Sequence, residues 1–396
     1  MSTTTEAAIV HGVDVHGTCD PRFAAVQEAF EKNLRTGEDI GASAAVFIDG
    51  EPFVDIWAGF VDDARTRPWQ RDTIVNNFST TKTMTALAAL VLADRGELDF
   101  EAPVAEYWPE FAAEGKRSVL VQHLLAHTSG LPGWTEPVTI DDILDREKAR
   151  TLLARQAPWF KPGSTLAYHA ITYGPLIGEV IRRITGRTLG AFFAEEVAGP
   201  LGADYHIGTG PECDARVSPM IQGSPYIQPG LNSVQDRVFF NPFVTPQIGS
   251  SVAWRRAELG GSNGHGNARS VAAIQSVFSN GGEARGVRLL SPAGCERALT
   301  VLADAVDPVM GLPLRFGLGY SLNSPAVTEL YGPAVDGHRL AFWGGSGGSF
   351  VMNDLDTRMT VAFVMNRHLE HGGLDHRATD VIRAAYACLP AGGRRS

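Results

Sequence analysis

Cysteine is scarce in this sequence and is nowhere clustered. Among 396 residues there are only Cys19, Cys213, Cys295 and Cys388, and no two of them form a C-x-x-C pair. Zinc sites and small disulfide-stapled domains both depend on closely spaced cysteines. We therefore expect neither a bound metal nor a disulfide framework, and the composition fits a reducing compartment.

Long apolar runs and an excess of positive charge are also missing. No stretch approaches the ~18 uninterrupted apolar residues of a membrane-spanning helix. Residues 1–11 have neither the basic nor the apolar region of a secretory signal. The formal net charge of −10 disfavours nucleic acid and anionic membrane surfaces as partners. We expect a cytoplasmic protein whose partner is a small molecule.

The most informative stretch that is present is Ser79-Thr80-Thr81-Lys82. It precedes an Ala- and Leu-rich run from Thr83 to Arg95 that has no Gly or Pro and stops at Gly96, a pattern typical of a buried helix. On such a helix Ser79 and Lys82 share one face. A serine hydroxyl needs a base to act as a nucleophile, and a lysine can be that base when burial lowers its pKa.

Other motifs compete with this one. Ser262 and Ser346 each lie in a G-x-S-x-G pattern, which marks the nucleophile of α/β-hydrolases only between a strand and a helix. Neither segment has both flanking elements, so we regard both matches as accidental. His123 and His127 have a metal-ligand spacing, but no third ligand is evident, and we expect a histidine that hydrogen-bonds the turn at a helix end.

Strand patterns occur at both ends of the chain and helix patterns in the middle. We expect strands over 41–48, 53–57, 316–322, 340–343, 348–353 and 359–366, helices over 21–36, 83–95, 141–156, 172–186, 268–278 and 375–389, and long loops over 208–250. The pattern predicts an α+β fold with one antiparallel sheet built from both termini, flanked by helices, and an inserted mainly helical domain. The expected domains are 1–78 plus 312–396 for the sheet and 79–311 for the helices, with the active site in the groove between them.

Several motifs together carry a family resemblance. They are Ser79-x-x-Lys82, His127-Thr128-Ser129-Gly130-Leu131, Pro162-Gly163 ahead of Tyr168, and Trp343-Gly344-Gly345. In this order they resemble the serine β-lactamase and penicillin-binding-protein superfamily, and most of all the class C-like family VIII carboxylesterases. The matched elements run from about residue 23 to the C-terminus. The resemblance implies a class C β-lactamase-like fold, which agrees with the layout of strands and helices.

The resemblance also implies a role for each matched residue. Ser79 would be the acylated nucleophile, and Lys82 would help to remove its proton. Tyr168, at the tyrosine of the family's Y-x-N motif, would pass a proton to the leaving group and then activate water. The backbone N–H groups of Ser79 and Ser346 would form the oxyanion hole. The expected substrate contacts are Trp343, Gly344, Gly345 and His169, and no metal or cofactor is expected.

Two departures from the family pattern narrow the range of substrates that we expect. Ala170 replaces the Asn of Y-x-N, and Trp343 replaces the Lys of K-T-G. An amide that would bind a peptide-like carbonyl and a cation that would hold a carboxylate are both lost. We therefore expect a serine esterase that cleaves neutral, short-chain carboxylic esters through an acyl-enzyme.

Three alternatives stay open. An acyltransferase of the same fold would pass the acyl group to an alcohol and give a transfer product. A β-lactamase or D-amino-acid peptidase would turn over a chromogenic cephalosporin, although the two replacements disfavour it. A non-catalytic binding or sensor protein would resist labelling by a serine-directed phosphonate.

Overall fold

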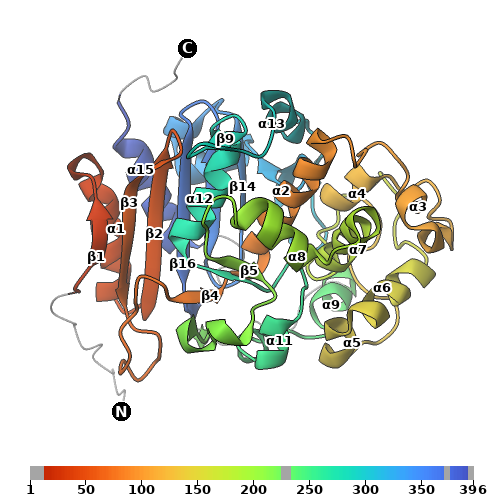
Figure 1. Cartoon of the computed structure of the whole chain (residues 1–396), viewed down its shortest axis with the longest axis horizontal. Helices are drawn as coiled ribbons and strands as arrows, with labels where there is room; N and C mark the ends of the chain where they lie inside the picture. Colours follow the sequence, from red (N-terminus) through yellow and green to blue (C-terminus); the bar gives the residue numbers. More distant parts are fainter. Residues whose placement is uncertain (1–12, 224–232, 370–374, 391–396) are drawn as a thin grey trace.

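The structure, a computed structural model, describes residues 13–223, 233–369 and 375–390. Its largest element is a nine-stranded antiparallel sheet in the left part of Figure 1. In spatial order the strands are β1 (His16–Cys19), β3 (Glu51–Gly59), β2 (Gly41–Ile48), β16 (Met359–Met365), β15 (Phe350–Asp354), β14 (Leu340–Gly344), β13 (Ser321–Leu322), β12 (Pro313–Phe316) and β11 (Ala303–Val306). Because β16 pairs with β2, both ends of the chain build one sheet, as predicted.

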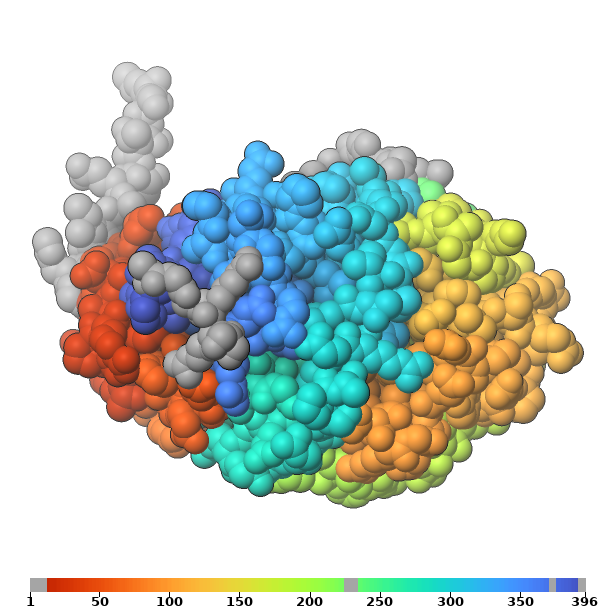
Figure 2. Space-filling view, turned by 90° about the horizontal axis from the view of Figure 1, so that it is seen from above, coloured from red at the N-terminus to blue at the C-terminus, as the bar shows by residue number. Residues whose placement is uncertain are grey.

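Helices cover both faces of the central strands. Every residue of β2 and of β16 is buried, in keeping with their apolar sequences. Helices α1 (Ala24–Arg35) and α15 (His376–Ala387) pack together on one face, and α12 (Ala268–Ser279) lies against β2, β15 and β16 on the other. In Figure 2 the red N-terminal and blue C-terminal segments accordingly share one end of the molecule, while orange and yellow segments form the other.

The middle of the chain forms the helices at the right of Figure 1. They include α2 (Thr81–Asp94), α3 (Val104–Tyr107), α4 (Val121–Leu125), α5 (Ile140–Leu144), α6 (Arg146–Arg155), α7 (Tyr173–Thr185) and α8 (Leu189–Phe193). Helix α2 is buried at every residue from Thr81 to Leu92, because small and apolar side chains surround it on all sides. It contacts α7 and α8 as well as α12 and β14, so it joins the helical part to the sheet.

A second, four-stranded sheet lies beside the start of α2. Its order is β5 (Tyr205–Ile207), β8 (Gly264–Gly266), β4 (Ile74–Asn76) and β6 (Val217–Ser218). The N–H of Asn77 donates to Gly264 O at 2.8 Å, and the N–H of Gly264 donates to Thr81 Oγ1 at 2.9 Å. These bonds hold the segment around residues 260–264 against the first turn of α2.

Three expectations about individual elements need correction. The helix expected over 141–156 is divided into α5 and α6, because the Asp145 side chain caps the N-terminus of α6. The strand expected over 316–322 is interrupted around Gly319, whose φ is +83°. Both β11 and α12 belong with the large sheet, so the sheet-bearing part of the chain includes residues well before 312.

The segment over 208–250 contains short elements rather than loops alone. Besides β6 these are β7 (Ile221–Gln222), α9 (Ser233–Phe239) and α10 (Pro246–Gly249), and residues 224–232 lie outside the described residues. Other short helices and strands are α11 (Val252–Arg256), β9 (Glu283–Ala284), β10 (Val287–Arg288), α13 (Pro292–Ala298), α14 (Pro325–Tyr331) and β17 (Arg367–His368). All four cysteines are free thiols. No helix within the described ranges is long and apolar enough to cross a membrane.

Two glycines of α7 provide a test of how this helix packs. A Cβ at Gly174 would lie 1.3 Å from the backbone oxygen of Leu259, whereas a Cβ at Gly178 would meet only the Leu189 side chain, at 3.6 Å. We predict that Gly174→Ala lowers the free energy of unfolding by about 1–3 kcal/mol or more, the usual cost of overpacking. The matched variant Gly178→Ala should leave it unchanged or raise it by up to ~1 kcal/mol, because alanine favours helix. Urea unfolding measures both, and equal stabilities would contradict the packing.

Candidate active site

Ser79 lies in a single 3₁₀ turn, Phe78–Thr80, that leads directly into α2. The residue before it, Phe78, has a φ of +42°, a left-handed value that residues other than glycine rarely adopt. The turn leaves Ser79 half-buried while its neighbours Thr80 and Thr81 are buried. The structure thus places Ser79 at the start of the buried helix, as the sequence pattern predicted.

Lys82 is buried beside Ser79, and its amine contacts three oxygen atoms. Its Nζ lies 3.0 Å from Ser79 Oγ, 2.9 Å from Ala170 O and 2.8 Å from Gly261 O. Burial lowers the pKa of Lys82 well below the usual range for a lysine. A neutral amine has two hydrogens, which suffice for the two carbonyls, so its lone pair then faces Ser79 Oγ.

Tyr168 completes the group of polar atoms around Ser79. Its hydroxyl donates to Ser79 Oγ at 2.7 Å, and the indole N–H of Trp343 donates to the Tyr168 oxygen at 3.2 Å. The Nζ atom of Lys82 lies 4.8 Å from the centre of the Tyr168 ring. Burial raises the pKa of Tyr168 above the usual range, so the phenol keeps its proton at neutral pH. The fold thus brings together four residues from three distant segments.

The loop after β14 passes close to the Ser79 turn. A Cβ at Gly345 would lie 2.2 Å from Asn77 O, so only glycine permits this approach. Ser349, at the far end of the loop, is buried and donates to the same oxygen at 2.7 Å. Ser346, the expected second oxyanion donor, is exposed on this loop. The loop and the Ser79 turn therefore form one connected unit.

His169, an expected substrate contact, is completely buried. Its ring nitrogens are hydrogen-bonded to Ser129 Oγ at 2.6 Å and to Ala167 O at 2.7 Å. Its backbone N–H donates to the Nδ1 atom of His127 at 3.1 Å. Burial lowers the pKa of both histidines, that of His169 to about 3, so both rings are neutral. They support the segment that carries Tyr168, and this geometry argues against a contact between His169 and substrate.

The competing motifs make contacts of other kinds. Ser262 is buried, and its hydroxyl donates to Ala170 O at 3.2 Å. Ser346 lies between two strands, β14 and β15, rather than between a strand and a helix. His123 Nδ1 accepts the N–H of Leu120 at 3.1 Å, so this histidine contacts the start of α4 and not the turn that follows the helix.

Only one group of side chains in the described ranges has the spacing of a metal site. His338, Asp354 and Asp356 could each offer one ligand atom. Asp354 Oδ2, however, contacts His338 Nδ1 at 2.7 Å and accepts from the Tyr386 hydroxyl at 2.8 Å, and Asp356 accepts from Arg339 Nε at 2.6 Å. These oxygens already have partners, and the group makes no contact with Ser79.

Sequence reasoning missed Asp307, which lies behind Tyr168. Its carboxylate accepts the backbone N–H of Tyr168 at 2.9 Å and that of Val309 at 2.6 Å. Burial raises the pKa of Asp307 to about 6. The pair Asp307-Pro308 signals a turn. Nothing in the sequence connects that turn with a tyrosine 139 residues away.

A separate apolar cluster surrounds Tyr168 and Trp343. Its other buried members are Leu166, Ala167, Ala170, Val238, Val309 and Phe316. Partly exposed side chains that pack on it include Trp159, Phe160, Val234, Phe239, Met310 and Leu314. The surroundings of the Ser79 partners on this side are therefore apolar.

Comparisons with known proteins agree with this geometry. The model of the family described as Beta-lactamase matches residues 26–386. The crystal structure of a family VIII carboxylesterase is similar, with 40% identity and a TM-score of 0.89 over 95% of this chain and 100% of that chain. A penicillin-binding-protein homologue from Caulobacter crescentus has 36% identity and a TM-score of 0.88, also over 95% of this chain and 100% of that chain.

A curated relative is similar over most of its own length as well. Esterase/beta-lactamase LipL of Mycobacterium tuberculosis is 35% identical over 373 residues, which cover 90% of this chain and 84% of LipL. The predicted resemblance is therefore confirmed at the level of sequence and of fold. On these matches, and with Ser79, Lys82 and Tyr168 in contact, the chain belongs to the beta-lactamase family.

Proposed function

We propose that this protein is a serine esterase that hydrolyses short-chain carboxylic esters through an acyl-enzyme on Ser79. The observation that carries the proposal is the contact of Ser79 Oγ with Lys82 Nζ at 3.0 Å and with the Tyr168 hydroxyl at 2.7 Å. Proteins similar over 95% and 90% of the chain are named a family VIII carboxylesterase and an esterase/beta-lactamase. We assign the esterase activity to this chain on both grounds.

Lys82 serves as the general base. Its two carbonyl partners, Ala170 O and Gly261 O, use the hydrogens of the neutral amine and leave the lone pair for the Ser79 proton. Burial stabilises this neutral form, because a charged amine loses the solvation of water there. A base of lowered pKa in direct contact with the nucleophile is the arrangement that activates a serine.

Tyr168 serves as the general acid. Its raised pKa keeps the phenol protonated, so it has a proton to give to the departing alkoxide. Trp343 donates to the phenol oxygen and so stabilises the charge that develops there as the proton leaves. Burial thus shifts the pKa values of Lys82 and Tyr168 in opposite directions, which separates the base from the acid.

The reaction then follows in two halves. Ser79 Oγ attacks the ester carbonyl carbon as its proton passes to Lys82 Nζ, and the oxyanion accepts the N–H groups of Ser79 and Ser346. The C–O bond to the alcohol breaks, Tyr168 protonates the alkoxide, and the protonated Lys82 then returns its proton to Tyr168. Water attacks the acyl carbon as its proton passes to the neutral Lys82. The bond from the acyl carbon to Ser79 Oγ then breaks, and Lys82 gives the proton to Ser79 Oγ as the carboxylic acid leaves.

The side chains around Ser79 favour an uncharged substrate. Trp343 presents an indole where K-T-G proteins present a lysine, and Ala170 presents a methyl group in place of an amide. The apolar cluster around Tyr168 adds aromatic and aliphatic side chains on the same side. A small apolar acyl group suits these surroundings better than a carboxylate does.

Ser79→Ala tests the nucleophile directly. The variant should lose hydrolysis of p-nitrophenyl butyrate by about a thousandfold or more, because the remaining groups cannot form an acyl-enzyme. Ser262→Ala is the control, since it removes one hydrogen bond to Ala170 O and should keep the rate within about tenfold. A fluorophosphonate should label the wild type and Ser262→Ala but not Ser79→Ala. If Ser79→Ala keeps the wild-type rate, Ser79 is not the nucleophile.

The pH dependence of kcat/KM tests the role of Lys82. The amine must be neutral to accept a proton, so activity should fall with decreasing pH through the lowered pKa of Lys82 and stay level above it. Asp307 also titrates near Tyr168, with its pKa raised to about 6. The profile is therefore measured again with Asp307→Asn. If kcat/KM of Asp307→Asn still falls at low pH, the ionisation belongs to Lys82. If that fall disappears, the ionisation belongs to Asp307.

Slow β-lactam hydrolysis is a second candidate, because LipL is named for both activities. Loss of the lysine and the amide at positions 343 and 170 removes two polar contacts, one of them charged. We predict a kcat/KM for a chromogenic cephalosporin about a hundredfold or more below that for p-nitrophenyl butyrate, since a charged hydrogen bond alone contributes about 1.5–3 kcal/mol. The residual rate should vanish in Ser79→Ala. A higher efficiency with the cephalosporin would reverse the order of the two activities.

A further inference from the structure

His368, in β17, contacts both segments that carry the expected oxyanion donors. Its Nε2 atom is hydrogen-bonded to Ser346 Oγ at 2.8 Å. Its ring centre lies 5.7 Å from that of Phe78, with the two planes at 79°. The residue is only 3% exposed. One buried ring therefore links the residue before Ser79 to the loop residue Ser346.

The loop is shaped to fit over this ring. Gly347 has a φ of +87°, and a Cβ there would lie 2.6 Å from the His368 ring. Gly348 has a φ of +126°, and a Cβ there would lie 2.4 Å from Asp375 Oδ2. Glycine at both positions lets the backbone lie directly on the side chains beneath it. The position of the loop thus depends on those side chains.

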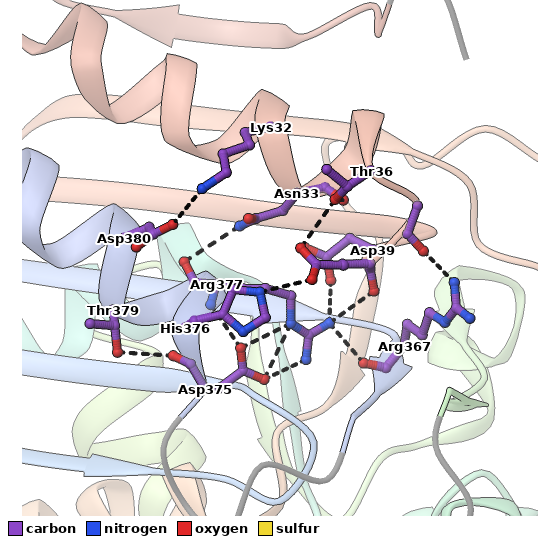
Figure 3. A network of polar contacts seen from close by, with 12 residues as sticks. Lys32, Asn33, Thr36, Asp39, Arg367, Asp375, His376, Arg377, Thr379 and Asp380 are labelled. Carbon is purple, nitrogen blue, oxygen red and sulfur yellow. Dashed lines mark hydrogen bonds and ion pairs between the residues drawn. The ribbon is translucent and has the colours of Figure 1, made fainter. Parts of the chain in front are cut away.

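Arg377, in α15, makes a second contact with the same loop. Its guanidinium is fully buried, and Nη2 donates to Gly347 O. Figure 3 shows the guanidinium between two carboxylates, with 2.5 Å from Nη1 to Asp39 Oδ1 and 2.5 Å from Nη2 to Asp375 Oδ2. Nη1 also donates to Arg367 O at 3.0 Å. Arg377 therefore fixes the loop and β17 relative to each other.

The turn on the other side of His368 is strained. Phe78 has a φ of +42°, a conformation that persists only where the surroundings enforce it. The ring of His368 packs against the Phe78 side chain and is part of those surroundings. Any change in this packing would reach the N–H of Ser79, which is the next residue.

We propose that His368 is a positioning residue for the reaction, and that its contacts with Phe78 and Ser346 aim the N–H groups of Ser79 and Ser346 at the same oxyanion. The inference rests on the proposed function, because it has a catalytic consequence only if these N–H groups stabilise the ester oxyanion. A misplaced N–H donor makes a weaker hydrogen bond to the oxyanion, where negative charge develops in the transition state. The loss therefore falls on kcat more than on KM.

The histidine ring acts in its neutral form. Burial, together with the nearby Arg377, lowers the pKa of His368 to about 4, although Asp375 opposes the effect of Arg377. A neutral ring has one donor and one acceptor nitrogen, so its contact with Ser346 is the same throughout the neutral range. A serine in contact with a neutral histidine is also the geometry of an activated nucleophile, and the experiment must separate the two roles.

The sharpest test removes only the Ser346 hydroxyl. Ser346→Ala keeps the backbone N–H and an exposed position, but removes the hydrogen bond to His368. The kcat for p-nitrophenyl butyrate should fall about 10- to 100-fold, less than complete loss of an oxyanion donor would cause. KM should change by less than about threefold, since ground-state binding is untouched. The matched variant Ser346→Thr keeps the hydroxyl and should restore most of the kcat.

A double variant checks that both residues act through one contact. His368→Gln removes the ring from Phe78 and from Ser346, so it should lower kcat at least as much as Ser346→Ala does. Adding Ser346→Ala to it should cause little further loss, because that contact is already broken. Urea unfolding of each variant separates these effects from lost stability. If His368→Gln does not fold, the Ser346→Ala and Ser346→Thr pair decides alone.

The outcomes distinguish this inference from the proposed function. Wild-type kcat in Ser346→Ala would overturn the positioning role and leave the esterase assignment intact, provided that Ser79→Ala is inactive. Fluorophosphonate labelling of Ser346 in Ser79→Ala would also overturn it, because Ser346 would then be a nucleophile. A Ser79→Ala variant that keeps the wild-type rate would overturn both.

Discussion

The removal of one amine from water is the constraint on which the rest of the site depends. Among the described residues, the hydrogen-bond partners of the Lys82 nitrogen are Ser79 Oγ and the carbonyls of Ala170 and Gly261. Three separate parts of the fold must meet to supply them: helix α2, the segment after Tyr168, and the turn before β8. The four-stranded sheet that pins residues 260–264 to the start of α2 makes this meeting possible.

In the proposed mechanism, burial by itself separates the acid from the base. The same loss of solvation lowers the pKa of Lys82 and raises that of Tyr168, because it penalises the charged form of each. It also keeps His127 and His169 neutral, so they add no charge that would disturb the pair. A site with one apolar environment thus holds two groups in the protonation states that the proposed ester cleavage needs.

Helices and strands whose formation depends on residues close together in the sequence could be predicted. The sequence patterns correctly placed the Ala- and Leu-rich helix α2, the hairpin of β2 and β3, the closing strands β14–β16 and helix α15. The errors arose where a single residue overrides the pattern. Asp145 divides a predicted helix by capping its second half, and Gly319 interrupts a predicted strand with a positive φ.

The candidate residues for chemistry can be recognised from short motifs along the chain: the Ser79 to Lys82 tetrad, Tyr168 and the Trp343 segment. Which side chains surround them depends on the fold. It turned His169 inward to Ser129, placed Asp307 behind Tyr168, and set His368 beneath the loop. These contacts join residues 40, 139 and 22 positions apart. Local periodicity carries no information about such pairs, because only the packing of complete elements brings them together.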